Sequence, residues 1–330
     1  MLKPGPRNLI TDVAGIRVGN AQDTVLCSGT TVILPDEPAV MAVDVRGGGP
    51  GTRETDALDA ENLVDAYHGL VLSGGSVFGL AAGDGVVDWL SEQGRGLAMG
   101  PKAIPVVPGA ILFDLMNGGD KDWVVNPYPA LGREACEAVG HDFALGSVGA
   151  GTGATAGPIK GGLGSASIDD GNGFMVGALM AANPFGEVLM PGTKSFWAWA
   201  LEEGEELGGQ LAPSAIDKPV SLSLPDLPAM TTNTTIGVVA VNAALTKSQA
   251  RRVAMMAQDG IARAIRPAHT PFDGDTLFVI AAGEQALPEP TPMAIARLGA
   301  MAADCVARAI MRGVYEASGL PNWPAFQDLD

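Results

Sequence analysis

Short apolar runs alternate along this chain with longer segments whose apolar residues recur at helical spacing. Residues 70–75, "LVLSGG", read as a strand, and residues 76–94 follow with apolar side chains roughly on one helix face. The same order of strand and helix recurs near the C-terminus. Strand-like residues 235–242 precede a helical segment at 245–267, and another strand-like run follows at 276–283. Elements that alternate in this way pack as layers. The sequence therefore predicts an α/β protein with central sheets and outer helices.

The same patterns predict the remaining elements. The sequence favours strands within residues 9–45 and 103–115, a short helix at 56–69, a strand, turn and strand at 174–189, and a helix at 292–317. Thr246 is the expected N-cap of the segment that Pro267 stops. Residues 203–232 are acidic and then rich in proline, which is typical of a linker.

Composition excludes several classes of function. The 330 residues carry a net charge of −17, which argues against nucleic acid and anionic membranes and favours neutral or cationic small ligands. Three isolated cysteines and three histidines suit neither a disulfide framework nor a zinc site, so neither a metal nor another cofactor is expected. Residues 1–13 lack the apolar core of a signal peptide, and no run reaches the roughly 18 residues of a membrane span, so the expected location is the cytoplasm.

Two glycine-rich stretches contain side chains that could act chemically. Ser76 follows two glycines, but Phe78 stands where a hydrolase elbow needs its second glycine, so we expect Ser76 to cap the following helix. Lys160 lies in residues 146–165, which lack the spacing of a phosphate-binding loop. Close packing would account for these glycines, but it does not account for a lysine among them.

Asp273 and Asp275 flank Gly274 just before a strand-like run. One interpretation is an ordinary Asp-Gly turn. The other is a pair of carboxylates at the mouth of a strand, placed to orient a reacting group.

Residues 231–242, "TTNTTIGVVAVN", join a cluster of threonines to a buried strand. A threonine hydroxyl is a weak nucleophile until a base takes its proton, and an α-amino group on the same residue can be that base. An internal threonine gains this amine when its hydroxyl attacks the preceding carbonyl and water cleaves the resulting ester. A linker, an asparagine, a threonine and a rigid strand are a suitable layout for that event.

Blocks in order along nearly the whole chain resemble the P1, or S58, family of N-terminal-nucleophile peptidases. They include "ITDVAGIRVGN", "VRGGGPGTRETDALDAEN", "LVLSGGSVFGL", "GAGTGATAGPIKGGLGS", "AANPFG", "NTTIGVVAVNAALTK" and "PFDGDTLFVI". That family contains L-aminopeptidase/D-esterases, β-peptidyl aminopeptidases and nylon-oligomer endohydrolases.

The resemblance implies a four-layer αββα sandwich and hydrolysis of amide bonds in small peptides or peptide-like oligomers. It also implies self-cleavage between Asn233 and Thr234. The resulting chains, 1–233 and 234–330, would stay together as an αβ unit, and such units would assemble into tetramers or larger homo-oligomers.

Individual residues match the active-site positions of the family. By resemblance, Thr234 is the nucleophile and its freed amine the base, while Asp273 and Asp275 orient both groups. Lys160 matches the active-site lysine, and Asn183 the amide that polarises the scissile carbonyl. Phe113 replaces a tyrosine found in some relatives, including the nylon-oligomer enzymes, so activity on the substrates of those relatives is in question.

Two alternatives remain open from the sequence. One is an acyltransferase of the ornithine acetyltransferase type, in which an amine takes the acyl group from the threonine; the "DGDT" and "RGGGPGTRETD" blocks favour the peptidases instead. The other is an uncleaved binding protein without catalytic activity, in which Thr234 is inert.

Overall fold

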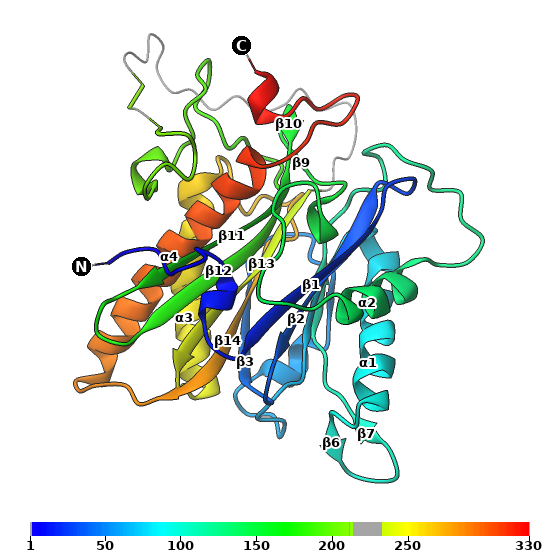
Figure 1. Cartoon of the computed structure of the whole chain (residues 1–330), viewed down its shortest axis with the longest axis vertical. Helices are drawn as coiled ribbons and strands as arrows, with labels where there is room; N and C mark the ends of the chain where they lie inside the picture. The colour runs from blue at the N-terminus through cyan, green and yellow to red at the C-terminus, as the bar shows by residue number, and fades with distance from the viewer. Residues whose placement is uncertain (1, 211, 214–232, 330) are drawn as a thin grey trace.

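Two five-stranded sheets form the centre of the computed structural model, which describes residues 2–210, 212–213 and 233–329 (Figure 1). In spatial order, the first sheet contains β1 (Ile16–Asp23), β2 (Ser28–Pro35), β5 (Leu70–Ser73), β8 (Gly109–Ile111) and β4 (Thr52–Arg53). The second contains β11 (Gly162–Asp169), β12 (Met175–Asn183), β13 (Thr234–Ala243), β14 (Thr276–Gln285) and β3 (Val40–Val45). Two short hairpins pair β6 (Leu97–Ala98) with β7 (Ala103–Ile104) and β9 (Thr155–Ala156) with β10 (Ile159–Lys160).

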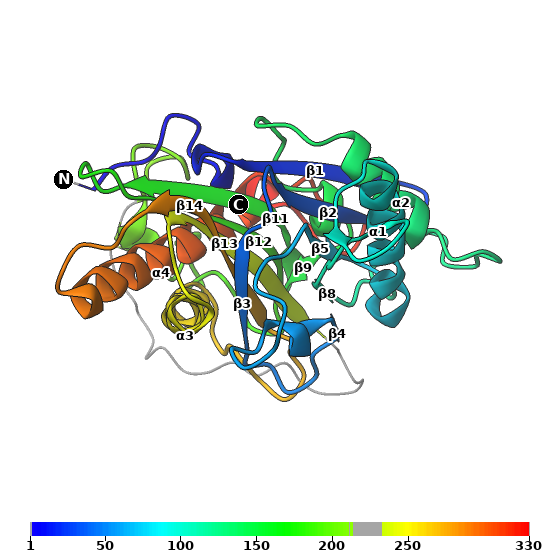
Figure 2. The same ribbon diagram turned by 90° about the horizontal axis from the view of Figure 1, so that it is seen from below.

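Helices cover the outer face of each sheet, as Figures 1 and 2 show. On the first sheet lie α1 (Ala82–Glu92) and α2 (Tyr128–Glu137), and on the second α3 (Lys247–Ala264) and α4 (Thr291–Tyr315). Short 3-10 turns are η1 (Ile10–Asp12), η2 (Thr55–Leu58), η3 (Ser76–Ala81), η4 (Gly149–Gly151), η5 (Trp199–Leu201) and η6 (Phe326–Asp328). The order helix, sheet, sheet, helix confirms the predicted αββα sandwich. None of the helices described is long and apolar enough to cross a lipid bilayer.

Strand β13 is buried on both faces, which explains its continuous apolar sequence. Consecutive side chains of a strand point to opposite sides of the sheet. Ile236 and Val238 therefore enter the core between the two sheets, together with Phe278 of β14. Val239 and Val241 enter the core between the second sheet and helices α3 and α4. An alternating polar pattern appears only where one face meets water, so β13 has none.

Helix α3 connects β13 to its parallel neighbour β14 and has the predicted start. The Thr246 hydroxyl accepts a hydrogen bond from the Gln249 amide nitrogen at 3.3 Å, and the Gln249 side chain accepts one from the Thr246 amide at 2.9 Å. This reciprocal pair satisfies two donors that the first turn leaves free. The helix ends at Ala264, and Ile265 is already extended two residues before Pro267, as expected upstream of a proline.

Two predicted elements are absent from the structure. Residues 56–69 form only the 3-10 turn η2 and an irregular segment in place of a helix. Residues 103–115 form two short strands, β7 and β8, separated by Pro105 and Pro108, which agrees with the strands predicted there. The second strand expected within 174–189 is absent, because Glu187 and Leu189 make only isolated bridges. Helix α2 and strand β11 were not predicted at all.

The start of the predicted linker at 203–232 is anchored to the fold. The buried Glu206 carboxylate accepts hydrogen bonds from the buried Arg308 guanidinium on α4 at 2.6 and 2.8 Å. Paired charges of this kind are costly to separate inside a protein. Residues 211 and 214–232, most of the predicted linker, lie outside the described residues.

Candidate active site

The ends of three central strands meet at one end of the second sheet. Asn183, the last residue of β12, is the register partner of Thr234, the first residue of β13. On the parallel neighbour β14, Thr276 is paired with Ile236. Ala181 and Ile236 both enter the core between the sheets, so Asn183 and Thr234 face the same way by alternation. The amide and the hydroxyl thus lie next to each other between the two sheets.

The Thr234 hydroxyl contacts the carbonyl of the residue before it. Its Oγ1 lies 2.5 Å from the Asn233 carbonyl oxygen, to which it donates a hydrogen bond. The Gly274 amide nitrogen donates both to that carbonyl oxygen, at 3.0 Å, and to Thr234 Oγ1, at 3.2 Å. Thr234 is only 4% exposed, so these contacts lie in a site that largely excludes water. The Thr234 hydroxyl, the Asn233 carbonyl and the Gly274 amide therefore form a buried group in which each is hydrogen-bonded to the other two.

Glycines are required where the backbone packs against this group. A Cβ at Gly274 would lie 2.8 Å from Thr234 Oγ1, and one at Gly47 would lie 2.3 Å from the Asp275 nitrogen. The Gly47 amide donates to the Asp275 carbonyl at 3.2 Å, and the Gly49 amide to the Asp273 carbonyl at 2.8 Å. The "RGGG" segment therefore lies directly along Asp273 and Asp275, which flank Gly274, at a distance that excludes side chains.

Asp273 holds the loop that leads into β14. Its Oδ1 accepts the Phe185 amide at 3.0 Å, and its Oδ2 accepts the amide and hydroxyl of Thr270 at 2.9 and 2.6 Å. Burial and the nearby Asp275 carboxylate raise the pKa of Asp273 above its ordinary value. Asp273 therefore does more than an Asp-Gly turn requires, because it ties this loop to the end of β12.

Asp275 pairs with a histidine that the sequence analysis did not select. Its Oδ1 accepts the Thr235 amide at 2.8 Å, and its Oδ2 accepts the His269 amide at 3.0 Å and faces His269 Nδ1 at 2.8 Å. His269 adopts a left-handed backbone conformation, with φ of 55°, that brings its backbone nitrogen and its ring Nδ1 to the same oxygen, Asp275 Oδ2. A histidine near two aspartates, in a chain with only three histidines, was the available signal.

The Asn183 side chain connects the two sheets. Its Oδ1 accepts the Thr155 amide at 2.9 Å, and its Nδ2 donates to the Phe113 carbonyl at 3.1 Å. Phe113 follows β8 of the first sheet, so this bond crosses from one sheet to the other. The half-buried Phe113 ring carries no hydroxyl, and its residue contributes a backbone carbonyl to the site instead.

Lys160 is fully buried close to this region. Its Nζ donates to the carbonyls of Gly151 and Gly161, each at 2.8 Å. It is linked to Asn183 through Thr155, its partner in the β9–β10 hairpin. Burial lowers the pKa of Lys160 from 10.5 to about 7. A neutral amine has two N–H groups, which match the two carbonyls.

Lys160 predicts a pH dependence of stability. The pKa of Lys160 is about 7 in the folded chain and 10.5 in the unfolded chain, so between these pH values the unfolded state binds more protons than the folded state. The free energy of unfolding therefore increases as the pH rises from 7 to 10.5. Lys160→Met removes the titrating group. We expect the melting temperature of this variant, relative to the unsubstituted protein, to be highest below pH 7 and to fall towards pH 10.5. A difference that does not change with pH would contradict this account of Lys160.

Ser76 does not cap a helix, contrary to expectation. Gly75 occupies the N-cap of η3 without a side-chain bond, and Ser76 is the first residue of that turn, with φ of 53°. Its amide donates to the Leu112 carbonyl at 2.9 Å, which fixes the backbone to the neighbouring strand instead.

Within the part of the chain described, no three His, Cys, Asp or Glu side chains are arranged to hold a metal ion.

Comparison with known sequences identifies relatives along almost the whole length. The sequence model of peptidase family S58 matches residues 8–323. An uncharacterized aminopeptidase of Mycobacterium tuberculosis H37Rv is 46% identical over 346 residues, covering 98% of each chain. A 6-aminohexanoate-oligomer endohydrolase of Kocuria sp. KY2 is 30% identical over 296 residues, covering 86% of this chain and 78% of the relative.

Solved structures share the fold at lower identity. A β-aminopeptidase from a Burkholderia species superposes with a TM-score of 0.71 at 23% identity, covering 98% of this chain and 91% of the other. An L-aminopeptidase D-Ala-esterase/amidase from Ochrobactrum anthropi, described as a variant of the Ntn hydrolase fold, gives 0.69 at 22% identity, covering 98% and 90%. These similarities establish the architecture of the sandwich.

Proposed function

Since the chain belongs to peptidase family S58 and is a hydrolase of peptide or amide bonds, we propose that it cleaves itself and then works through Thr234 as an N-terminal nucleophile. The contact that carries the proposal joins the Thr234 hydroxyl to the Asn233 carbonyl oxygen at 2.5 Å, beside a shared Gly274 amide donor. Relatives named as aminopeptidases and as a 6-aminohexanoate-oligomer endohydrolase suggest small peptides or peptide-like amides as substrates.

Self-cleavage begins with attack of Thr234 Oγ1 on the Asn233 carbonyl carbon. The hydroxyl loses its proton, and negative charge develops on the Asn233 oxygen, to which Gly274 donates at 3.0 Å. The C–N bond then breaks, and the nitrogen takes up the proton that the hydroxyl gave up, so that it becomes the α-amine of Thr234. Water hydrolyses the remaining ester, which leaves a carboxylate on Asn233 and restores the hydroxyl.

Turnover uses the same atoms on an external amide. The freed α-amine takes the proton of its own hydroxyl, which attacks the substrate carbonyl carbon. The substrate C–N bond breaks, its nitrogen leaves as an amine with that proton, and the acyl group stays on Thr234 as an ester. Water then hydrolyses the acyl-Thr234 ester, which releases the acid and restores the hydroxyl. The substrate acyl group would take the place of Asn233, so the Gly274 amide and Asn183 are the proposed donors to its oxygen. Asp273 and Asp275 keep the loop and the Thr235 backbone in position, and Lys160 supports Asn183 through the β9–β10 hairpin.

The two fragments are expected to remain together after cleavage. Strand β13 pairs with β12 on one side, and β14 pairs with β3 on the other, so residues 234–330 stay hydrogen-bonded within a sheet to which residues 1–233 contribute three of the five strands. We propose that this αβ unit assembles into a tetramer or a larger homo-oligomer, as the family resemblance implies.

Intact-mass spectrometry under denaturing conditions tests the proposal. Cleavage between Asn233 and Thr234 would give fragments of about 24 and about 10 kDa from a chain of 33.6 kDa, if mass scales with length. Terminal sequencing of the smaller fragment should begin at Thr234. A single species of 33.6 kDa after prolonged incubation would overturn self-cleavage.

His269 gives a sharper prediction about the positioning of Asp275. His269→Ala removes the side-chain donor to the buried carboxylate and strains a left-handed position, so cleavage should slow by roughly tenfold or more. His269→Asn should stay within a few-fold of the unsubstituted protein, because its Nδ2 takes the place of the ring Nδ1 and asparagine tolerates positive φ. Timed gel analysis measures both rates, and equal rates for the alanine variant and the unsubstituted chain would remove His269 from the site.

A further inference from the structure

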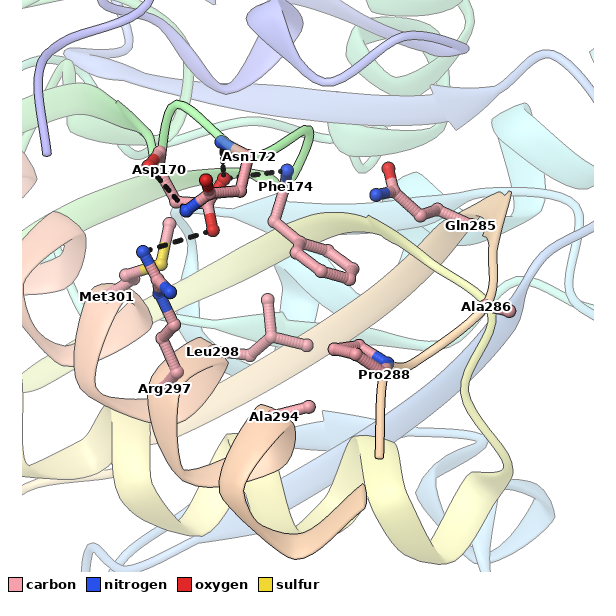
Figure 3. Close-up of a pocket in the computed structure, with 10 residues that line it drawn as sticks. All are labelled: Asp170, Asn172, Phe174, Gln285, Ala286, Pro288, Ala294, Arg297, Leu298 and Met301. Atoms are coloured by element: carbon pink, nitrogen blue, oxygen red, sulfur yellow. Dashed lines mark hydrogen bonds and ion pairs between the residues drawn. The ribbon is translucent and has the colours of Figure 1, made fainter. Parts of the chain in front are cut away.

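Figure 3 shows the residues that line a cavity of about 300 Å³. The cavity lies at the end of the second sheet opposite to Thr234. Its walls are the turn between β11 and β12, the residues that follow β14, and the first turns of α4. Strand β12 runs from this turn to Asn183, and its nine residues span about 26 Å at about 3.3 Å per residue. The cavity is therefore separate from the candidate active site.

One end of the cavity carries a buried carboxylate. Asp170 Oδ1 accepts the amides of Asn172 and Phe174 at 2.7 and 2.9 Å, which hold the turn. Its Oδ2 is buried and receives no hydrogen bond from the described part of the chain. This oxygen lies 3.3 Å from Nη2 of the half-exposed Arg297 on α4. A carboxylate oxygen can accept more than one donor, so Oδ2 retains capacity for a further N–H group.

The rest of the cavity is mostly apolar. Figure 3 shows the Phe174 ring and the Leu298 side chain beside the Asp170–Arg297 pair, with Pro288 beyond them and Ala294 below. A ligand that fits this lining needs an apolar body and a polar end with both charges. The positive and negative groups at that polar end would lie against Asp170 and Arg297 respectively, which are adjacent in space.

We propose that this cavity binds a free α-amino acid with an apolar side chain. The ammonium group would donate to Asp170 Oδ2, the carboxylate would meet the Arg297 guanidinium, and the side chain would lie against Phe174 and Leu298. The adjacency of Asp170 and Arg297 selects an α-amino acid, whose charges are separated by one carbon, over an amino acid with charges at opposite ends. The assignment does not depend on the nucleophile proposed above.

Calorimetric titration of the full chain with L-leucine tests the proposal. We expect saturable binding of leucine. The analogues 3-methylbutylamine, which lacks the carboxylate, and 4-methylpentanoate, which lacks the ammonium group, should each bind at least about tenfold more weakly, because each loses one charge-assisted contact. Equal affinity for all three compounds, or no saturable heat with leucine, would overturn the proposal.

Matched variants locate the bound leucine. Arg297→Gln should weaken binding at least about tenfold, whereas Arg263→Gln, which removes another half-exposed arginine of an ion pair, should not. Ala294→Phe fills the cavity and should abolish binding, whereas Ala296→Phe changes an exposed position of the same helix and should not. Each variant is first checked for an unchanged melting temperature. Unchanged affinity in Ala294→Phe would place leucine elsewhere and overturn the proposal.

Discussion

Thr234→Ala is expected to remain a single chain of 33.6 kDa and to hydrolyse no amide substrate. The substitution removes the Oγ1 atom that lies 2.5 Å from the Asn233 carbonyl oxygen, so neither the acyl shift nor the freed amine can form. Loss of a nucleophile that acts together with its base lowers turnover by roughly 10³-fold or more. Intact mass and an assay with amide substrates measure the two effects separately.

Neighbouring hydroxyls provide the controls. Thr234→Ser keeps a hydroxyl in the same place and should still cleave itself. Thr235→Ala should also cleave, because the Thr235 side chain points to the opposite face of β13, where its buried hydroxyl has no hydrogen-bond partner in the described part of the chain. Cleavage that persists in Thr234→Ala would assign the nucleophile to Thr235 or to Thr232, which lies outside the described residues.

Asn183→Ala is expected to slow turnover by roughly 10²–10³-fold, the usual effect of losing one donor to the developing oxyanion. The variant also leaves the Thr155 amide and the Phe113 carbonyl without the partners that Asn183 provides, which costs about 1–3 kcal/mol of stability. Rates of self-cleavage and of substrate hydrolysis, measured well below the melting temperature, separate the catalytic loss from the structural one.

Asn242→Ala is a matched control at the far end of β13. Asn242 Oδ1 accepts the Met175 amide at 2.9 Å, and its Nδ2 donates to the Gly173 carbonyl at 2.8 Å, so it makes the same two kinds of backbone contact as Asn183. Because Asn242 is partly exposed, water can take over these contacts, so this variant should lose less stability than Asn183→Ala and keep its turnover. If Asn183→Ala and Asn242→Ala have the same rates, Asn183 has no part in the chemistry.

Part of the site could be proposed from local sequence patterns, because Thr234 begins a buried strand and Asp273 and Asp275 flank a glycine before the next. Asn183, which ends a third strand, was identified only through the resemblance to the family. The structure brings these four together at one end of one sheet. His269 was missed because its contact with Asp275 depends on a left-handed backbone that has no periodic signal. Ser76 was misread because a hydrogen bond from its amide to the carbonyl of Leu112, just after β8, fixes its backbone in place of a helix cap.

The sequence by itself determined the layered class, the strands β12, β13 and β14 and the capped start of α3, because hydrophobic periodicity and capping are local properties. It also identified the family through blocks spread along the chain. Only the tertiary structure decided that Asn183 and Thr234 are register partners, that Gly274 donates to the Asn233 carbonyl, and that Lys160 is buried on two carbonyls. Those facts depend on how distant strands pair and on which side chains lose contact with water, and neither is encoded in any short segment.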